Sequence, residues 1–250
     1  MKQFFLNILA LLILAACSPV MYTPTAYQVP MFEQKGEAAI TVGYHGIDDG
    51  DGDGFNLQVA ATVDNNIAIT ATLNYFQDVY RKDQSQNYWK SSGSYIEAGL
   101  GKYGFIADSP RIKYEIYGGV GYGRSNNQHN HDRIYAAYYK PYIQPNIGIS
   151  GKHIEFAVTT RFAIVSFKDP DYFTADAEYR DRVRTFFDEK SSSVVFEPGF
   201  TLRGGLPNLK AQLQYVYSTF NYQEGDGANF GYSNNYASLG LFWLISNRYK

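Results

Sequence analysis

The chain has 250 residues with 22 basic and 24 acidic groups, enough for one domain or two small ones. Its net charge of −2 argues against a nucleic-acid partner, because phosphate binding needs an excess of lysine and arginine. Tyr (23), Phe (17) and Gly (23) are abundant and cysteine occurs once, which suits an all-β protein without an internal disulfide.

Residues 1–16 are typical of a secretory signal peptide. Lys2 supplies positive charge, and the apolar run Phe4–Leu14 is too short to cross a bilayer as a helix. The run leads into Leu14-Ala15-Ala16-Cys17, which closely resembles the lipobox of bacterial lipoprotein precursors. The resemblance implies cleavage before Cys17 and diacylation of its thiol; the alternative is an ordinary signal peptide with an incidental cysteine. No later segment is apolar enough for a spanning helix, so a chain that crosses a membrane must do so as a closed β-barrel.

Residues 17–36 are predicted to form an N-terminal linker and residues 37–246 a β-barrel. Ten segments of the second region alternate apolar and polar side chains with a period of two. Each reaches the roughly 9–11 residues that a tilted strand needs to cross hydrocarbon. We therefore expect an all-β fold, an antiparallel up-and-down transmembrane β-barrel of about ten strands. The segments are Glu37–His45, Phe55–Val63, Asn66–Phe76, Ser94–Phe105, Ile112–Arg124, Tyr135–Ser150, His153–Ser166, Ser193–Arg203, Leu209–Ser218 and Tyr236–Leu244.

Short and long connections take turns along the chain. The tight ones are 63–65, 107–110, 150–152 and 204–207, whereas the long polar ones are 46–54, 78–92, 125–134, 169–191 and 221–234. Transmembrane barrels have this asymmetry, with short periplasmic turns and long outer loops. A lipid anchor at Cys17 would put the N-terminus on the periplasmic side, and ten strands would return the C-terminus there. We therefore predict an outer-membrane protein that is anchored on its periplasmic side.

Charged side chains of both signs lie on the polar faces of the predicted strands. They are expensive to expose to lipid but can pair inside a lumen. Since a ten-stranded barrel is narrow, we expect these pairs, with Tyr117 and Tyr142, to fill most of the interior and leave at most a thin water path. The charges concerned are Glu97, Lys113, Glu115, Glu155, Arg161 and Glu197.

Three prolines fall inside predicted strands, namely Pro141, Pro145 and Pro198. Proline cannot donate a ladder hydrogen bond and is normally found at edges or bulges. Because a closed barrel has no edge, we expect bulges at these positions, or a strand that begins later.

The run Asp49–Gly54 has carboxylates at alternate positions, as calcium loops do at their start. An EF-hand would need a bidentate glutamate at the twelfth position, which is Ala60 here. The run therefore favours a flexible acidic loop. Weak calcium binding by Asp49, Asp51 and Asp53 is the alternative, and no other cofactor is predicted.

A second candidate site lies at His129, His131 and Asp132, which could bind a metal or supply a general base. Ten-stranded outer-membrane proteases carry acidic and histidine side chains at their outer rim, and this chain resembles them there in composition alone. It has no Gly-x-Ser-x-Gly and no His-Glu-x-x-His motif. A solvated polar loop is favoured, with a rim hydrolase as an alternative.

A short helix is predicted at residues 174–189, in the longest connection. Tyr179, Val183, Phe186 and Phe187 share one face of it at helical spacing. We expect the helix to cap the mouth of the barrel, or alternatively to contact a partner.

The chain after Cys17 resembles the small outer-membrane β-barrel proteins of Gram-negative bacteria, in the broad class of outer-membrane protein A and X barrels and porin-like proteins. Tyr236–Leu244 is aromatic-rich and alternating, like the terminal strand that barrel-assembly machinery reads, although Ser246–Lys250 continues past it. The stretches Tyr22–Pro30 and Glu33–Glu37 look like the opening segment of barrel proteins that also carry a lipobox. The resemblance implies outer-membrane lipids and barrel-assembly machinery as partners.

These observations predict a non-enzymatic outer-membrane β-barrel lipoprotein with a structural, adhesive or narrow porin-like role. One alternative is a lipid-anchored soluble β-barrel or sandwich that binds an apolar ligand. The two differ in which face is inside, because the soluble protein would turn its apolar face inward.

Overall fold

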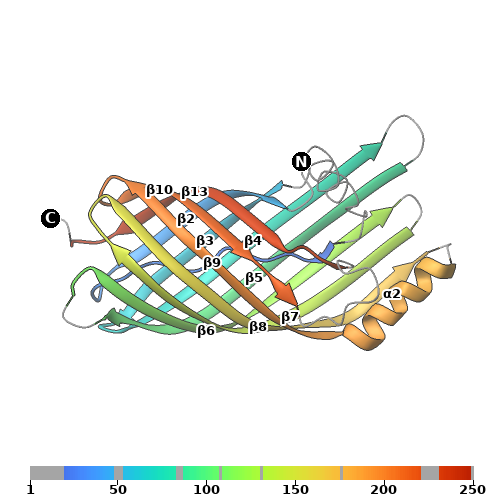
Figure 1. The fold of residues 1–250 in the computed structure, drawn as a ribbon, viewed down its shortest axis with the longest axis horizontal. Helices are drawn as coiled ribbons and strands as arrows, with labels where there is room; N and C mark the ends of the chain where they lie inside the picture. Colours follow the sequence, from blue (N-terminus) through green and yellow to red (C-terminus); the bar gives the residue numbers. More distant parts are fainter. Residues whose placement is uncertain are drawn as a thin grey trace, which may run out of the picture.

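The computed structural model describes residues 20–47, 53–82, 87–106, 109–129, 132–174, 177–220 and 231–248. Long antiparallel strands form a barrel with a helix at one end (Figure 1). The long strands are β2 (Ala38–Ile47), β3 (Asp53–Asp64), β4 (Ile67–Lys82), β5 (Asn87–Phe105), β6 (Ile112–His129), β7 (Asp132–Ser150), β8 (Ile154–Phe173), β9 (Ser192–Gly205), β10 (Leu209–Tyr217) and β13 (Asn235–Ile245). The short ones are β1 (Val20–Tyr22), β11 (Thr219–Phe220) and β12 (Gly231–Tyr232).

The barrel closes because β13, the last strand, pairs with β2 along the whole of Ala38–Ile47. β10 pairs with both β13 and β9. β11 continues along β9 after a break at Ser218, so β10 and β11 act as one strand of the wall. Ten strands therefore form the wall, which confirms the predicted antiparallel up-and-down barrel.

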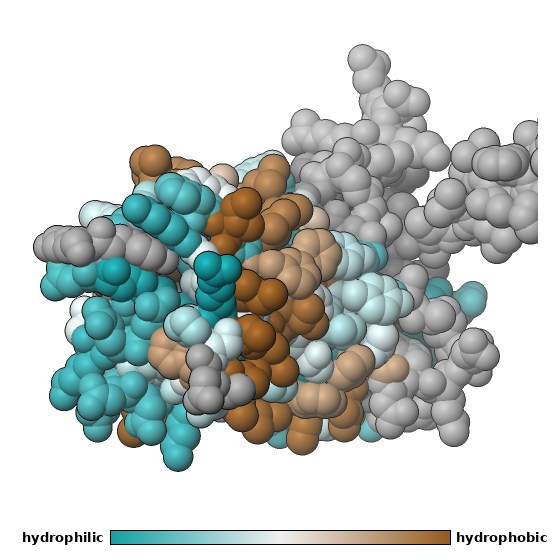
Figure 2. Space-filling model, turned by 60° about the vertical axis from the view of Figure 1, so that its left-hand side comes forward, coloured by the Kyte–Doolittle hydropathy of each residue, from teal (hydrophilic) through white to brown (hydrophobic). Residues whose placement is uncertain are grey.

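The two faces of the wall differ in polarity as predicted. On β7, the side chains of Ile143 and Ile147 are 51% and 56% exposed, whereas Gln144 between them is 0% exposed. Figure 2 shows the outward face as a brown apolar band between more polar ends. A membrane-spanning barrel needs this arrangement, with lipid outside and hydrogen-bonded polar groups inside. It contradicts the soluble alternative, which required an apolar interior.

Several strands run beyond the length that hydrocarbon requires. β5 and β7 have 19 residues each and β8 has 20. The predicted long loops at 78–92 and 125–134 are therefore wrong for most of their length, because the ladder continues to Lys82–Asn87 and His129–Asp132. Polar side chains do not end a strand above the membrane surface, since water can solvate both of its faces there.

The bulges predicted at the prolines are also wrong. Pro145 lies opposite Ile116 of β6 and Pro198 lies opposite Thr160 of β8, and the register is constant through both positions. The register shift between β7 and β8 lies instead between Tyr135 and Ala137. A missing N–H removes one bond but does not require an extra residue, and the neighbouring pairs hold the register.

Helix α2 (Ala177–Lys190) confirms the helix predicted in the longest connection. Val183, Phe186 and Phe187 are buried on one face, and the ring centroids of Phe186 and Phe167 of β8 are 5.5 Å apart. Tyr179 packs against the same cluster. The helix thus rests on the end of the barrel away from the tight turns (Figure 1). Among the described residues, no helix is both long and apolar enough to cross a membrane.

Candidate functional site

The lumen is occupied by the chain itself. Residues 20–37, which precede β2 and which we call the N-terminal plug, run along the barrel as the blue trace of Figure 1. Every residue from Met21 to Phe32 is buried. The sequence predicts a linker at 17–36, and this misses its role, because the polar lumen supplies the hydrogen bonds that an extended backbone cannot make to itself.

The plug is extended because its sequence disfavours a helix. Pro24 and Pro30 fix their own φ angles and push the preceding residues toward extended conformations. Beyond Pro30 the backbone bends, with φ of 57° at Met31 and 87° at Gly36. Glycine adopts such an angle without strain, whereas at Met31 surrounding contacts must hold it. The amide of Met31 donates to Glu115 Oε1 at 2.7 Å, which is one such contact.

Four charged residues hold the plug at the end with the tight turns, and we call Glu33, Glu37, Lys113 and Arg248 the latch. Arg248, beyond β13, donates to Glu33 Oε1 at 2.9 Å and to Glu37 Oε2 at 2.7 Å. Lys113 of β6 donates to Glu33 Oε1 at 2.7 Å. Burial raises the pKa of Glu37, but the hydrogen bond and charge of Arg248 outweigh it and hold that pKa below its usual range. The latch thus joins the plug to the C-terminal segment and to the wall.

Side-chain amides replace the backbone partners that the middle of the plug lacks. Gln144 and Asn146 of β7 donate to the carbonyl oxygen of Gln28 at 2.6 and 2.8 Å. Gln214 of β10 donates to the carbonyl of Tyr27 at 2.9 Å and accepts the amide of Tyr27 at 3.2 Å. β7 and β10, which β8 and β9 separate in the wall, therefore bond two adjacent residues of the plug.

A buried network of charges encloses the plug beyond this point. Arg161 of β8 lies 3.3 Å from Glu97 of β5 and 3.8 Å from Glu197 of β9. Lys140 of β7 lies 2.9 Å from Glu197. Tyr22 of the plug completes the network, since its hydroxyl donates to Glu197 and accepts from Lys140 at 2.6 Å. All five side chains are buried, which confirms that charges of opposite sign pair inside the lumen.

A second ion cluster lies on the lumen side of β8, β9 and β10. Glu155 is 3.1 Å from both Arg203 and Lys210. Glu115 instead accepts hydrogen bonds from the plug and from the amide of Asn146, the latter at 3.0 Å. These groups, together with the plug, leave the interior filled by protein along most of its length.

The other end of the plug is fixed near the long connections. The amide and carbonyl of Val20 both bond the side chain of Asn127, at 3.0 Å each, close to the end of β6. β1 pairs in parallel with β12, and the amide of Ser233 donates to the carbonyl of Tyr22 at 2.8 Å. Aromatic rings cover this end, where Phe220 and Tyr232 have centroids 4.0 Å apart.

The plug therefore crosses the barrel from end to end. Its Glu37 end lies with the tight turns, whereas Val20 lies at the opposite end. The prediction that the chain is anchored on the side of the tight turns concerns Cys17, whereas Val20, the first described residue, lies at the end with the long connections. Cys17 lies outside the described residues.

The predicted metal and rim residues are largely outside the described residues. This holds for Asp49, Asp51 and His131. Asp53 is exposed at the start of β3, where its carboxylate accepts the hydroxyl of Tyr44 at 2.9 Å. Asp132 begins β7. Within the described part of the chain, no three His, Cys, Asp or Glu side chains are grouped for a metal ion.

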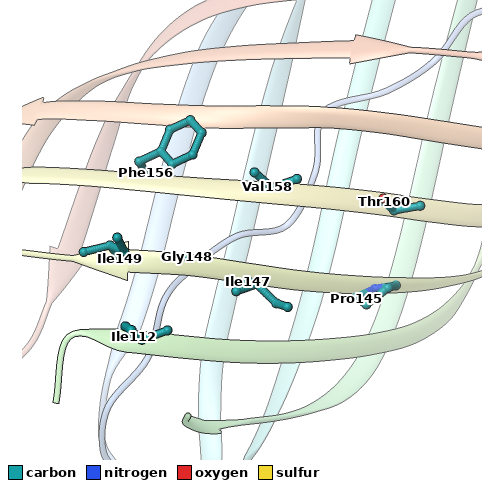
Figure 3. Close-up of a pocket in the computed structure, with 8 residues that line it drawn as sticks. All are labelled: Ile112, Pro145, Ile147, Gly148, Ile149, Phe156, Val158 and Thr160. Atoms are coloured by element: carbon teal, nitrogen blue, oxygen red, sulfur yellow. The ribbon is translucent and has the colours of Figure 1, made fainter. Parts of the chain in front are cut away.

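Within the described part of the chain, the outer wall has a depression of about 510 Å³ across β6, β7 and β8 (Figure 3). Its lining residues are Ile112, Pro145, Ile147, Gly148, Ile149, Phe156, Val158 and Thr160. Its lining is apolar apart from Thr160. Because it opens on the outward face, lipid acyl chains would fill it, and it offers no chemistry for a reaction.

No protein-family model and no curated protein matches the chain. Among solved structures, it is similar to the outer membrane protease OmpT from Escherichia coli, with 9% identity over 84% of this chain and 96% of that one and a TM-score of 0.48. Ail, the attachment invasion locus protein of Yersinia pestis, has 13% identity over 85% of this chain and 100% of that one, with a TM-score of 0.36. LpxR from Salmonella typhimurium has 8% identity over 82% of this chain and 99% of that one, with a TM-score of 0.38. These similarities assign no role to this chain.

The residues that sequence reasoning missed are those that hold the plug. Gln144, Asn146 and Gln214 lie on the polar faces of the strands without a charge to single them out, and Arg248 lies in the segment after the last strand. One available signal was the plug's composition, since Tyr22–Phe32 mixes prolines, aromatics and polar residues without the acidic and glycine-rich character of a solvated linker.

Proposed function

We propose that the protein is an outer-membrane β-barrel lipoprotein of a Gram-negative bacterium, with a structural or adhesive role and neither an open pore nor an enzymatic activity. The observation that carries the proposal is the N-terminal plug, which occupies the lumen from Val20 to Glu37.

The membrane location rests on the polarity of the wall. Large apolar side chains cover the outward face, whereas buried charges face inward and are paired. A closed barrel of this kind satisfies its backbone within the sheet and exposes only apolar groups to hydrocarbon. The lipobox-like Leu14–Cys17 supports the lipoprotein assignment and export from the cytoplasm.

The sealed lumen argues against the narrow porin-like role. A solute path needs lumen side chains that are free to contact water, but the charged ones here, such as Lys140, Arg161 and Glu197, bond the plug or one another. Opening such a path would break buried ion pairs such as Lys140–Glu197, and each unpaired buried charge costs several kcal/mol, roughly 3–5 for a broken pair. The hydrolase alternative stays a prediction at His129, His131 and Asp132.

Conductance across a planar lipid bilayer tests the proposal. We expect the full chain to insert without stable conductance steps, and a variant that lacks residues 20–32 to fold in lower yield, with its folded fraction inserting and conducting. Heat-modifiable migration on a gel, which reports a folded barrel, establishes that both proteins are folded before the comparison. Stable conductance steps from the full chain would contradict the sealed lumen. Release of the protein from cell envelopes without detergent would contradict the membrane barrel.

A further inference from the structure

The plug is long enough to carry the chain across the whole membrane. At one end, Glu33 contacts Lys113 near the start of β6, and at the other Val20 contacts Asn127 near its end. At about 3.3 Å per residue, these two positions on β6 are ~45 Å apart along the strand. With the usual tilt this is roughly 35 Å along the barrel axis, more than the ~25 Å of the apolar band of such barrels.

The direction of this crossing is fixed by independent contacts at each end. The latch holds Glu33 and Glu37 beside the tight turns, while β12, Ser233 and Asn127 hold β1 at the opposite end. Between the two ends, buried hydrogen bonds to Tyr27 and Gln28 fix the position of the middle of the plug relative to the wall. Val20, the first described residue, therefore lies at the end opposite the tight turns.

The distance from Val20 to Cys17 then limits where a lipid on Cys17 can lie. Three residues reach at most about 10 Å. This is too short to return through a lumen that the plug already fills, or to cross ~25 Å of hydrocarbon. A diacylglycerol on Cys17 can therefore enter only the leaflet at the long-connection side.

We propose that the segment upstream of Val20 emerges on the outer surface of the cell, and that the lipid of Cys17 anchors in the outer leaflet after passing through the protein's own barrel. The proposal rests on the proposed outer-membrane function, in which tight turns face the periplasm and long connections face outward. The partner of this N-terminal end is thus the lipid of the outer leaflet.

Epitope display on intact cells tests this placement. The same flexible ten-residue epitope is inserted in three full-length proteins, between Ser18 and Pro19, between Asp64 and Asn65 in a tight turn, and within the connection 221–230. The first insertion leaves the processing site through Ser18 unchanged. We expect antibody to bind the first and third proteins on intact cells, and the second only after the outer membrane is permeabilised.

The outcomes separate this proposal from the proposed function. If the N-terminal epitope is reached only after permeabilisation while the 221–230 epitope is reached on intact cells, the surface placement is wrong and the barrel assignment stands. If the 221–230 epitope is also hidden until permeabilisation, the membrane orientation itself is wrong. Metabolic labelling with palmitate, lost in a Cys17→Ala variant, establishes whether the displayed segment carries the lipid.

A disulfide across the plug provides a second test that leaves the N-terminal sequence at its natural length. In a Val20→Cys/Asn127→Cys protein, the two thiols stand at positions where the side chain of Asn127 already contacts the backbone of Val20, and we expect them to form a disulfide in cells. A matched Val20→Cys/Asn65→Cys protein should form none, because Asn65 lies in a tight turn at the other end. Cross-linking in the second protein instead of the first would overturn the proposal.

Discussion

Arg161 of β8 and Glu97 of β5 form an ion pair of 3.3 Å, although β6 and β7 separate their strands in the wall. The same guanidinium donates to Thr25 Oγ1 of the plug at 2.9 Å and lies 5.4 Å from the ring centre of Tyr27. One side chain therefore connects two parts of the wall with the plug. Because the site is buried, each of these charges depends on its partners for solvation.

Replacing Arg161 by methionine should strongly destabilise the folded protein. The change keeps an unbranched side chain but leaves Glu97 as a buried, uncompensated charge, which costs about 3–5 kcal/mol. The measurement is the urea midpoint of unfolding in detergent, followed by heat-modifiable migration. As a control, Arg184→Ala removes an exposed pair with Asp188 on α2 and should change the free energy by less than about 0.5 kcal/mol. Equal effects from the two variants would show that the lumen network does not stabilise the barrel.

Arg248→Ala should loosen the plug without opening the wall. Arg248 bonds Glu33, Glu37 and the carbonyl of Met31, so its loss frees one end of the plug while the strand ladders remain. Hydrogen exchange measured by mass spectrometry should rise in peptides that cover residues 20–37 and stay constant in β6 and β7.

A matched control for the latch is Lys35→Ala. Lys35 also pairs with the wall, since its Nζ lies 3.6 Å from Asp64, but the side chains of Lys35 and Asp64 are 61% and 59% exposed. Such surface pairs contribute little. If Lys35→Ala raised hydrogen exchange in the plug as much as Arg248→Ala, the latch residues would not be what holds this end of the plug.

Acidification should release the same end of the plug. The pKa of Glu37 is lower in the folded protein than in the unfolded chain, so its contribution to stability is complete above its usual value of about 4.5 and is lost as the pH falls through the lowered value. Hydrogen exchange in the plug, corrected for the intrinsic effect of pH, should therefore rise below about pH 4.5. In an Arg248→Ala protein this dependence should be weaker, because the charge that lowers the pKa is gone. A plug that became tighter on acidification would contradict this assignment.

Cysteines at two neighbouring positions of β4 should report the two sides of the wall. Ile69 is 46% exposed on the outward face, whereas Thr70 is 5% exposed in the lumen. In proteoliposomes, a lipid-soluble maleimide should label an Ile69→Cys protein and not a Thr70→Cys protein. Labelling in the reverse pattern would mean that the apolar face is not the one in contact with lipid.

The wall could be predicted from the sequence because each strand records its orientation locally. Ile147 and Gln144 reveal opposite faces by their spacing alone, and tight turns divide the strands. The sequence of the plug has no such periodic pattern from which its position could be predicted. The amides that receive it are far away in the chain, as with Gln144 and Gln28, so only the closed barrel brings them together. At the prolines the local sequence was misleading. A local rule predicted bulges there, but the residue pairs on both sides keep a constant register.

The seam between β13 and β2 has a consequence for assembly. β2 follows the plug directly, and it is also the strand that the last-synthesised long strand must meet. A plug already lying against β6 and β7 would be enclosed when that seam forms, whereas one left outside would have to be drawn through a finished ring. Charged side chains of the lumen bond to the plug. We therefore expect the strands of the barrel to close around a plug that is already in place. Membrane insertion and enclosure of the plug are then a single event, and mutations in the plug should lower the yield of closed barrels before they alter the closed barrel itself.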